Sequence, residues 1–183
     1  MLAEKELVAA LQTDGSRDEA FRQLVTQYKE RLYWQIRNIV LNHDDADDVL
    51  QNTFIKVYRN IDSFRGNSKL HTWMYRIAAN EAITFLNKKA KRNNISIENL
   101  KSEAVRKLET DVYFDGDAFQ RHFQKAIATL PERQQLIFTM KYFSEHTFEE
   151  LSEILETSVG GLKSSYHIAV KKITEFVKNN EIK

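Results

Sequence analysis

The chain has 183 residues, with 27 lysines and arginines against 26 aspartates and glutamates. A net charge of +1 argues against a protein that binds nucleic acid through an overall basic charge, so any such binding must come from local patches. The absence of cysteine excludes disulfides and thiolate metal sites, and it is typical of a reducing compartment.

Long helices are the expected secondary structure. A hydrophobic content of 42% suffices for packed cores, whereas one proline and five glycines are few for a chain of this length. No apolar run is long enough to span a bilayer, and residues 1–15 lack the apolar segment of a signal peptide. We therefore expect a cytoplasmic protein that is not embedded in a membrane.

Apolar spacing predicts three helices in the first 61 residues. A short one around Leu7 to Leu11 stops at residues 13–16, and a long one runs from Asp18 to about Val40. Residues 43–48 form an acidic cluster, in which Asp44 or Asp45 is expected to cap the third helix. The outward face of this helix mixes acids and amides with apolar side chains, which favours protein docking over a solvated helix start. Its members are Asp47, Asp48, Gln51, Asn52, Ile55 and Tyr58.

Residues 63–92 begin with a polar loop, continue as a helix and end in a basic run. One helix side carries an apolar stripe that includes Met74, Ala78 and Ala82. Rings, amides and cations on the other side suit unpaired bases and phosphates, although a solvated helix face explains the pattern equally well. These side chains are Trp73, Arg76, Asn80, Thr84, Asn87 and Lys88.

Residues 93–112 are polar and weakly periodic, so we expect a linker, in which residues 104–109 can form a helical turn or two. The expected division is a first domain over 1–92, the linker over 93–112 and a second domain over 113–183.

Four helices are predicted in the second domain. The first spans Asp117 to Thr129 and the second starts at Pro131, with Phe119, Phe123 and Phe143 among their buried residues. A capping box, Thr147 with Glu150, opens a short third helix, and Ser158 caps a fourth that ends near Lys178. A short capped helix, a tight turn and a helix with a basic exposed face are typical of a helix-turn-helix motif, with a plain helical hairpin as the alternative. The exposed face carries Lys163, Ser164, His167, Ile168, Lys171 and Lys172.

Three runs, in this order and spacing, resemble the bacterial extracytoplasmic-function sigma factors. They are DDVLQNTF at 47–54, FRGNS with TWMYRIAAN at 64–80, and LPERQ with FSEHTFEELSEIL at 130–155. The resemblance covers nearly the whole chain. It implies an all-α protein of two small helical domains joined by a flexible linker, the second a four-helix domain with a helix-turn-helix.

The resemblance also implies the function. Such a protein binds RNA polymerase core at the beta-prime clamp and the beta flap, and it recognises the minus-ten and minus-thirty-five promoter elements. It also promotes DNA melting and is regulated by an anti-sigma factor. It is not an enzyme, and it needs no cofactor, metal or small-molecule substrate.

Three sets of residues follow from the resemblance. The residues expected to bind core polymerase are Asp47, Asp48, Gln51, Asn52, Ile55 and Tyr58. The residues expected to contact minus-ten DNA are Phe64, Arg65, Asn67, Lys69, His71, Trp73, Arg76, Asn80, Lys88 and Lys89. The residues expected to contact minus-thirty-five DNA are Arg133, Thr147, Lys163, Ser164, His167 and Lys171.

The chain departs from the family pattern at three positions. Asn52 stands where the family usually has Glu, and Ser165 and Ile168 stand where many relatives have Arg. Arginines that contact guanine each contribute about 1–3 kcal/mol of discrimination, so recognition here is expected to depend on DNA shape or to favour A·T-rich sequence.

Two other classes of function explain parts of the sequence. A stand-alone helix-turn-helix repressor leaves the acidic helix and the Trp73 side of its helix without a role. An enzyme would have to use His43 and Asp44 as metal ligands, and the chain shows no further set of ligands, no phosphate-binding loop and no nucleophile–base arrangement. The sequence leaves open how the two domains are arranged in the free protein.

Overall fold

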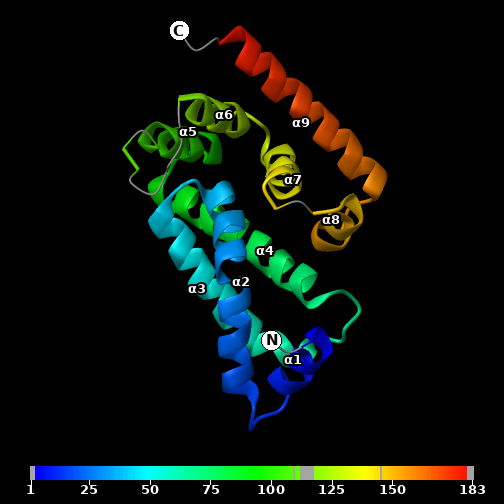
Figure 1. The fold of residues 1–183 in the computed structure, drawn as a ribbon. Coiled ribbons are helices and arrows are strands. Elements are labelled where there is room, and N and C mark those ends of the chain that lie inside the picture. Colours follow the sequence, from blue (N-terminus) through cyan, green and yellow to red (C-terminus); the bar gives the residue numbers. More distant parts are fainter. Residues whose placement is uncertain (1–2, 109, 112–117, 145, 181–183) are drawn as a thin grey trace.

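The structure is a computed structural model that describes residues 3–108, 110–111, 118–144 and 146–180. These residues are almost entirely helical and include no strand, which confirms the all-α prediction (Figure 1). None of their helices is long and apolar enough to cross a membrane. The elements are α1 (Glu4–Leu11), α2 (Arg17–Val40), α3 (His43–Asn60), the short 3-10 helix η1 (Ile61–Ser63), α4 (Leu70–Asn93), α5 (Ile97–Lys107), α6 (Ala118–Ala128), α7 (Glu132–Tyr142), α8 (Phe148–Leu155) and α9 (Val159–Asn179).

Helices α1 to α4 form the first unit. Helices α2, α3 and α4 pack against one another, and α1 packs on α2. Their core consists of the apolar side chains that recur at helical spacing, including the fully buried Leu24, Leu32 and Met74. The predicted N-cap of α3 is wrong: the cap is Asn42, whose side-chain oxygen accepts the Asp45 backbone N–H at 2.9 Å. An amide caps as well as a carboxylate, and Asp45 is instead held by a distant lysine, as described below.

Helices α6 to α9 form the second unit, with Ile127, Phe138 and Ile173 at the centre of its core. The predicted caps are confirmed. Thr147 and Glu150 form a reciprocal capping box at the start of α8, and the Ser158 hydroxyl accepts the Gly161 N–H at the start of α9. Helices α8 and α9 are joined at residues 156–157 and form the predicted helix-turn-helix pair.

Helix α5 occupies the segment expected to connect the two domains, and it is longer than the predicted turn or two. Ser96 caps its N-terminus, and Leu100, Lys101 and Val105 are buried. The helix contacts α6 on one side and α4 on the other, so the connecting segment packs against both units.

The two units pack against each other in the free chain. Helix α8 lies against α4, and α7 lies against α2, while α9 extends away from the first unit (Figure 1). Apolar residues of α7 and α8, among them Ile137, Met140 and Leu151, join the same buried cluster as the core of the first unit. The structure therefore shows a closed arrangement of the two units.

Candidate protein and nucleic-acid interfaces

The outward face of α3 is available to a partner. Five of the six side chains predicted for core polymerase are exposed, and Ile55, an apolar residue, leaves 46% of its surface in solvent. Those five are Asp47, Asp48, Gln51, Asn52 and Ile55. We call them the α3 face. An apolar side chain ringed by acids and amides fits a protein interface with a small apolar centre and a polar rim.

The sixth residue, Tyr58, is turned toward α2 and is half-buried. Its hydroxyl donates to Asp18 at 2.8 Å, and its ring meets the Phe21 ring edge-on at a centroid distance of 4.9 Å. The structure therefore places Tyr58 beside the α3 face, as a contact that fixes α3 on α2.

The contacts of His43 bear on the alternative of a metal site at His43 and Asp44. The His43 ring lies 2.7 Å from the Tyr33 hydroxyl through Nδ1, and 3.6 Å from Asp47 through Nε2. Among the residues that the structure describes, no group of three His, Cys, Asp or Glu side chains could hold a metal ion. His43 thus contacts Tyr33 of α2 and Asp47 of α3 at the start of α3.

The loop before α4 is shaped by backbone and apolar contacts. Gly66 adopts a φ of +71°, a conformation that side chains with a Cβ rarely take. The Gln12 amide donates to the carbonyls of Phe64 and Ile61 at 2.9 and 3.0 Å, which ties the loop to the segment after α1. Of the residues predicted to contact minus-ten DNA, the loop exposes Arg65, Asn67 and Lys69.

Phe64 is buried and packs against Trp73, with ring centroids 5.3 Å apart. It therefore supports the Trp73 ring from within and is not itself presented to DNA. Trp73 is half-buried, and Asn80, two turns further along α4, is exposed.

Three basic side chains at the start of α4 face carboxylates of α8. Arg76 forms an ion pair with Glu156. The Nζ atom of Lys69 lies 3.6 Å, and Nε2 of His71 lies 3.5 Å, from the same Glu150 oxygen. The predicted minus-ten side chains are thus brought together, and in this arrangement they are engaged by the second unit.

The two lysines near the C-terminal end of α4 have different surroundings. Lys88 is exposed, whereas the Lys89 ammonium donates to the Asp45 carboxylate at 2.7 Å and lies over the Phe85 ring. Lys88 is therefore available to a phosphate and Lys89 is committed to linking α4 with α3.

The exposed face of α9 agrees with the pattern in the sequence. Lys163, Ser164, His167 and Lys171 are exposed, and 42% of Ile168 lies in solvent between them. Two further predicted contacts lie nearby. The Arg133 guanidinium, at the start of α7, donates to the Thr157 hydroxyl, and Thr147 is exposed at the start of α8.

An aromatic patch on α6 and α7 was missed in the sequence, where Phe119 and Phe143 were predicted to be core. Phe119 is 54% exposed and Tyr142 is 53% exposed, and Phe143 also reaches the surface. Phe123 packs against all three rings at centroid distances of 5.5 to 6.5 Å. Neighbouring exposed rings of this kind are typical of a protein-binding surface.

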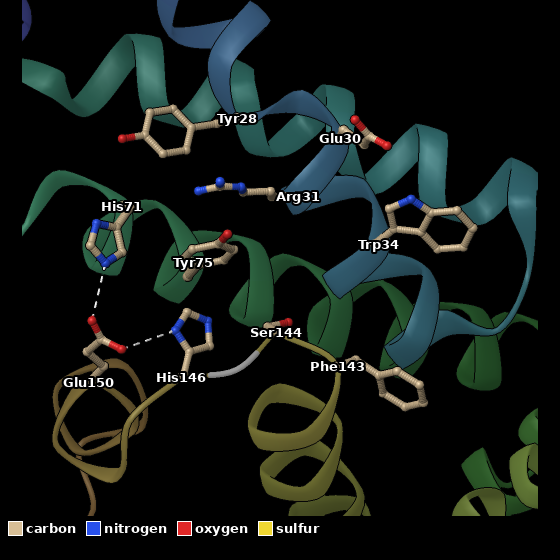
Figure 2. A pocket seen from close by; sticks show the side chains of 10 residues that line it. All are labelled: Tyr28, Glu30, Arg31, Trp34, His71, Tyr75, Phe143, Ser144, His146 and Glu150. Carbon is tan, nitrogen blue, oxygen red and sulfur yellow. Dashed lines mark hydrogen bonds and ion pairs between the residues drawn. The ribbon is translucent and has the colours of Figure 1, made fainter.

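A cavity of about 670 Å³ opens between the units, bounded by α2, α4 and residues 143–150 (Figure 2). Arg31 extends from α2 between Tyr28 and Tyr75, and Glu150 lies between His71 and His146. The His146 ring meets the Tyr75 ring edge-on at 4.5 Å.

The carboxylate of Glu150 in this cavity has a strongly lowered pKa. Burial raises its pKa, but the Thr147 backbone N–H, the hydrogen bond from His71 and the positive charges of His146 and His71 outweigh burial and lower the pKa to about 2. Burial also lowers the pKa of His146, against the opposing pull of Glu150. At neutral pH, Glu150 is therefore charged and His146 is neutral.

Both helical units match families of known proteins. The family model "Sigma-70 region 2" matches residues 24–92, and "Sigma-70, region 4" matches residues 120–173. The ECF RNA polymerase sigma factor SigW of Bacillus subtilis is 32% identical over 158 residues, which are 81% of this chain and 84% of that protein. The ECF RNA polymerase sigma-E factor of Escherichia coli K12 is 30% identical over 171 residues, 89% of this chain and 88% of that protein.

Two solved structures have the same fold. CnrH, in complex with the cytosolic domain of CnrY, has a TM-score of 0.71 at 17% identity and covers 97% of this chain and 99% of its own. The sigma factor RpoE of Bartonella quintana, in complex with the anti-sigma factor NepR, has a TM-score of 0.67 at 22% identity and covers 86% and 96%.

Proposed function

Because the chain belongs to the extracytoplasmic-function sigma factors, the family of promoter-recognising subunits of bacterial RNA polymerase, we propose that its two helical units divide core binding and promoter recognition between them. The proposed domains are residues 1–92 and 113–183, joined by residues 93–112. The observation that carries the proposal is the placement of an acidic, partly apolar α3 face on one unit and a basic α9 face on the other.

The first unit docks on the beta-prime clamp of core polymerase through the α3 face. Asp47 and Asp48 supply negative charge, and Ile55 supplies the apolar centre. The second unit docks on the beta flap through the aromatic patch of Phe119, Tyr142 and Phe143. Two separate contacts would hold the units apart on the surface of the enzyme.

Minus-ten DNA is opened by Trp73, Arg76 and Asn80, with Lys88 on the phosphates of the upstream duplex. Stacking one base on an aromatic ring contributes about 1–3 kcal/mol, close to the cost of removing one base from the duplex stack. Trp73 is suited to this role because Phe64 supports it from within. The free energy gained by stacking captured bases therefore offsets the cost of melting the duplex. The sigma factor acts without catalysis.

Minus-thirty-five DNA is bound as duplex by Lys163, Ser164, His167 and Lys171 in the major groove. Ile168 is exposed among them, and an apolar side chain in this position can contact the methyl group of thymine. We therefore expect promoter selection from a random library to return A·T-rich minus-thirty-five elements. A G-rich consensus would contradict this assignment.

An anti-sigma factor is the proposed regulator, since both structural neighbours were solved as complexes: CnrH with the cytosolic domain of CnrY, and RpoE with the anti-sigma factor NepR. The protein works in the cytoplasm, where core polymerase is found.

Charge reversal on the α3 face tests the function. Asp48→Lys should lower core affinity at least tenfold and abolish run-off transcription, because it places a cation where the clamp meets negative charge. Asp14→Lys, which reverses an exposed acid in the turn after α1, is the matched control and should behave like the wild type. If Asp48→Lys joins core normally, the docking assignment is wrong.

A further inference from the structure

We propose that the N-terminal segment, residues 4–17, is a positioning element for minus-ten DNA: Glu4, Gln12 and Arg17 hold residues 61–70 in the shape that presents their exposed side chains to the promoter. The inference rests on the proposed function, which assigns those exposed side chains to minus-ten DNA. The N-terminal segment comprises α1 and the turn that leads into α2. The family model for the first unit begins only at residue 24 and assigns this segment no role.

The loop at residues 64–69, which we call the minus-ten loop, has little internal bonding of its own. No described residue accepts a hydrogen bond from the backbone N–H groups of residues 65–68. Gly66 adopts its left-handed conformation in open space, with no atom within 4 Å of the position that a Cβ would take. A loop without fixed structure loses conformational freedom when it binds, and this loss weakens binding. Contacts from elsewhere in the chain are therefore needed to fix its shape before DNA arrives.

Gln12 holds the start of the minus-ten loop. It is the C-cap of α1, and its Nε2 donates to the carbonyl oxygens of Ile61 at 3.0 Å and Phe64 at 2.9 Å. The Phe64 N–H also donates to the Ile61 carbonyl, at 3.1 Å, which closes a turn. An amide nitrogen carries two hydrogens, so one side chain fixes both ends of that turn. Because Phe64 supports the Trp73 ring, Gln12 also steadies the ring proposed to stack on a base.

Glu4 holds the other end of the minus-ten loop. Its Oε1 accepts the backbone N–H of Leu70 at 3.0 Å, between residues 66 positions apart in the sequence. Leu70 is the first residue of α4, whose N-cap, Lys69, makes no side-chain cap and whose first turn contains no acid. The first N–H groups of a helix lack partners within the helix and favour a nearby negative charge. Glu4 thus supplies, from another helix, the acceptor that a local capping residue normally provides.

Arg17 joins the N-terminal segment to the turn before the minus-ten loop. Its Nε donates to the Leu11 carbonyl at the end of α1, at 2.9 Å, and its guanidinium forms an ion pair with Asp62 of η1. Leu7 and Leu11 are buried in the core of the first unit, so the segment is itself anchored. Figure 1 shows α1 beside the loop that leads into α4. The loop is therefore held at its start, at its end and through the turn before it.

Proteolysis of the free chain tests whether these contacts hold the loop. Gln12→Glu keeps the size of the side chain but replaces the N–H donors with a carboxylate oxygen, which repels the two carbonyls. The matched control, Gln23→Glu, adds the same charge at an exposed position of α2. Tryptic cleavage after the exposed Arg65, followed by mass spectrometry, reports how often the loop opens. We expect Gln12→Glu to speed this cleavage about fivefold and the control to change it less than twofold.

The Glu4 contact is tested by a pair of variants. Glu4→Ala removes the acceptor for the Leu70 N–H and should speed cleavage after Lys69 about fivefold, which is about 1 kcal/mol, the net contribution of one hydrogen bond. Glu4→Gln keeps an amide oxygen in the same place, so it should remain within twofold of the wild type. Equal cleavage rates in Glu4→Ala and Glu4→Gln, together with a wild-type rate in Gln12→Glu, would overturn the proposal.

Base unstacking by the holoenzyme tests positioning on DNA. The signal is the fluorescence of 2-aminopurine in the non-template strand of the minus-ten element, on a promoter selected from the random library. We expect Gln12→Glu to lower the unstacking rate constant about fivefold at unchanged core affinity. Ile36→Val removes one methylene group from the core on α2 and leaves the three contacts in place. It should lower the thermal unfolding midpoint and leave the unstacking rate within twofold, which separates positioning from loss of stability.

The outcomes distinguish the inference from the proposed function. Unstacking at the wild-type rate in Gln12→Glu and Glu4→Ala, or an equal loss of rate in Ile36→Val, would overturn the inference. If the wild-type holoenzyme unstacks no minus-ten base on any selected promoter, the proposed function is refuted instead. The cleavage rates of the free chain would then still report whether the N-terminal segment holds the minus-ten loop.

Discussion

The α3 face makes a quantitative prediction at Ile55. Burying an isoleucine completely stabilises a structure by about 1.5–3 kcal/mol relative to full exposure. Ile55 still exposes 46% of its surface, so roughly 1 kcal/mol remains for a partner to gain. Ile55→Ala should therefore weaken binding to core polymerase about fivefold, since 1.4 kcal/mol corresponds to tenfold.

The measurement is a titration of core polymerase into fluorescently labelled variant, with thermal unfolding to verify the fold. Ile168→Ala is the matched control: it makes the same change at a side chain that is 42% exposed, on the face of α9 that we propose binds DNA. We expect Ile168→Ala to leave core affinity unchanged within twofold. If Ile55→Ala binds core as tightly as wild type, the α3 face is not the apolar centre of the interface.

Three further outcomes follow from charged groups. The pKa of His146 is lowered in the folded chain, so the unfolded chain binds more protons below about pH 6.5 and the urea midpoint should fall between pH 7.5 and 5.5, with much of this fall absent in His146→Gln. The lowered pKa of Glu150 adds a further loss of stability only below about pH 4.5, as the pH falls toward about 2. Lys101→Met should raise the unfolding free energy by about 1 kcal/mol in urea titrations, because burial lowers the pKa of that ammonium and its hydrogen-bond partner is a neutral amide; destabilisation would show that the Lys101 hydrogen bond outweighs its desolvation. Lys163→Ala should reduce the salt slope of holoenzyme binding to promoter duplex by about one, and an unchanged slope would remove Lys163 from the phosphate contacts.

Exposed helix faces could be predicted from sequence because they depend on local spacing. On α9, Lys163, His167 and Lys171 recur at intervals of four, and four residues bring the chain round to nearly the same side of a helix. The same geometry placed Asp48, Gln51 and Ile55 on one face of α3. Caps with a hydroxyl and a glutamate three residues on, as at the start of α8, are equally local and were confirmed.

Side chains whose partners are distant in sequence could not be placed in the same way. Lys89 was predicted to bind DNA, but its partner Asp45 lies 44 residues earlier in the chain. Tyr58 is similarly held by Asp18, 40 residues away. Helix α5 was underestimated because its buried residues find partners only when α4 and α6 have packed around it.

The aromatic patch reveals the converse error. Phe119 and Phe143 have the composition and spacing of core residues, and periodicity alone cannot distinguish an apolar face that packs on the same chain from one left for a partner. An exposed aromatic surface is typical of a protein-binding site, and from the sequence alone its residues cannot be distinguished from core residues.

The net charge of +1 acquires a physical explanation from these contacts. A protein that must find polymerase before DNA gains nothing from a strong field that would hold it on any duplex, because nonspecific binding grows with each cation offered to phosphates. Here Arg76 is paired with Glu156, and Glu150 faces Lys69 and His71 while it also caps α8. One carboxylate thus caps α8 and also lies beside two basic side chains at the start of α4.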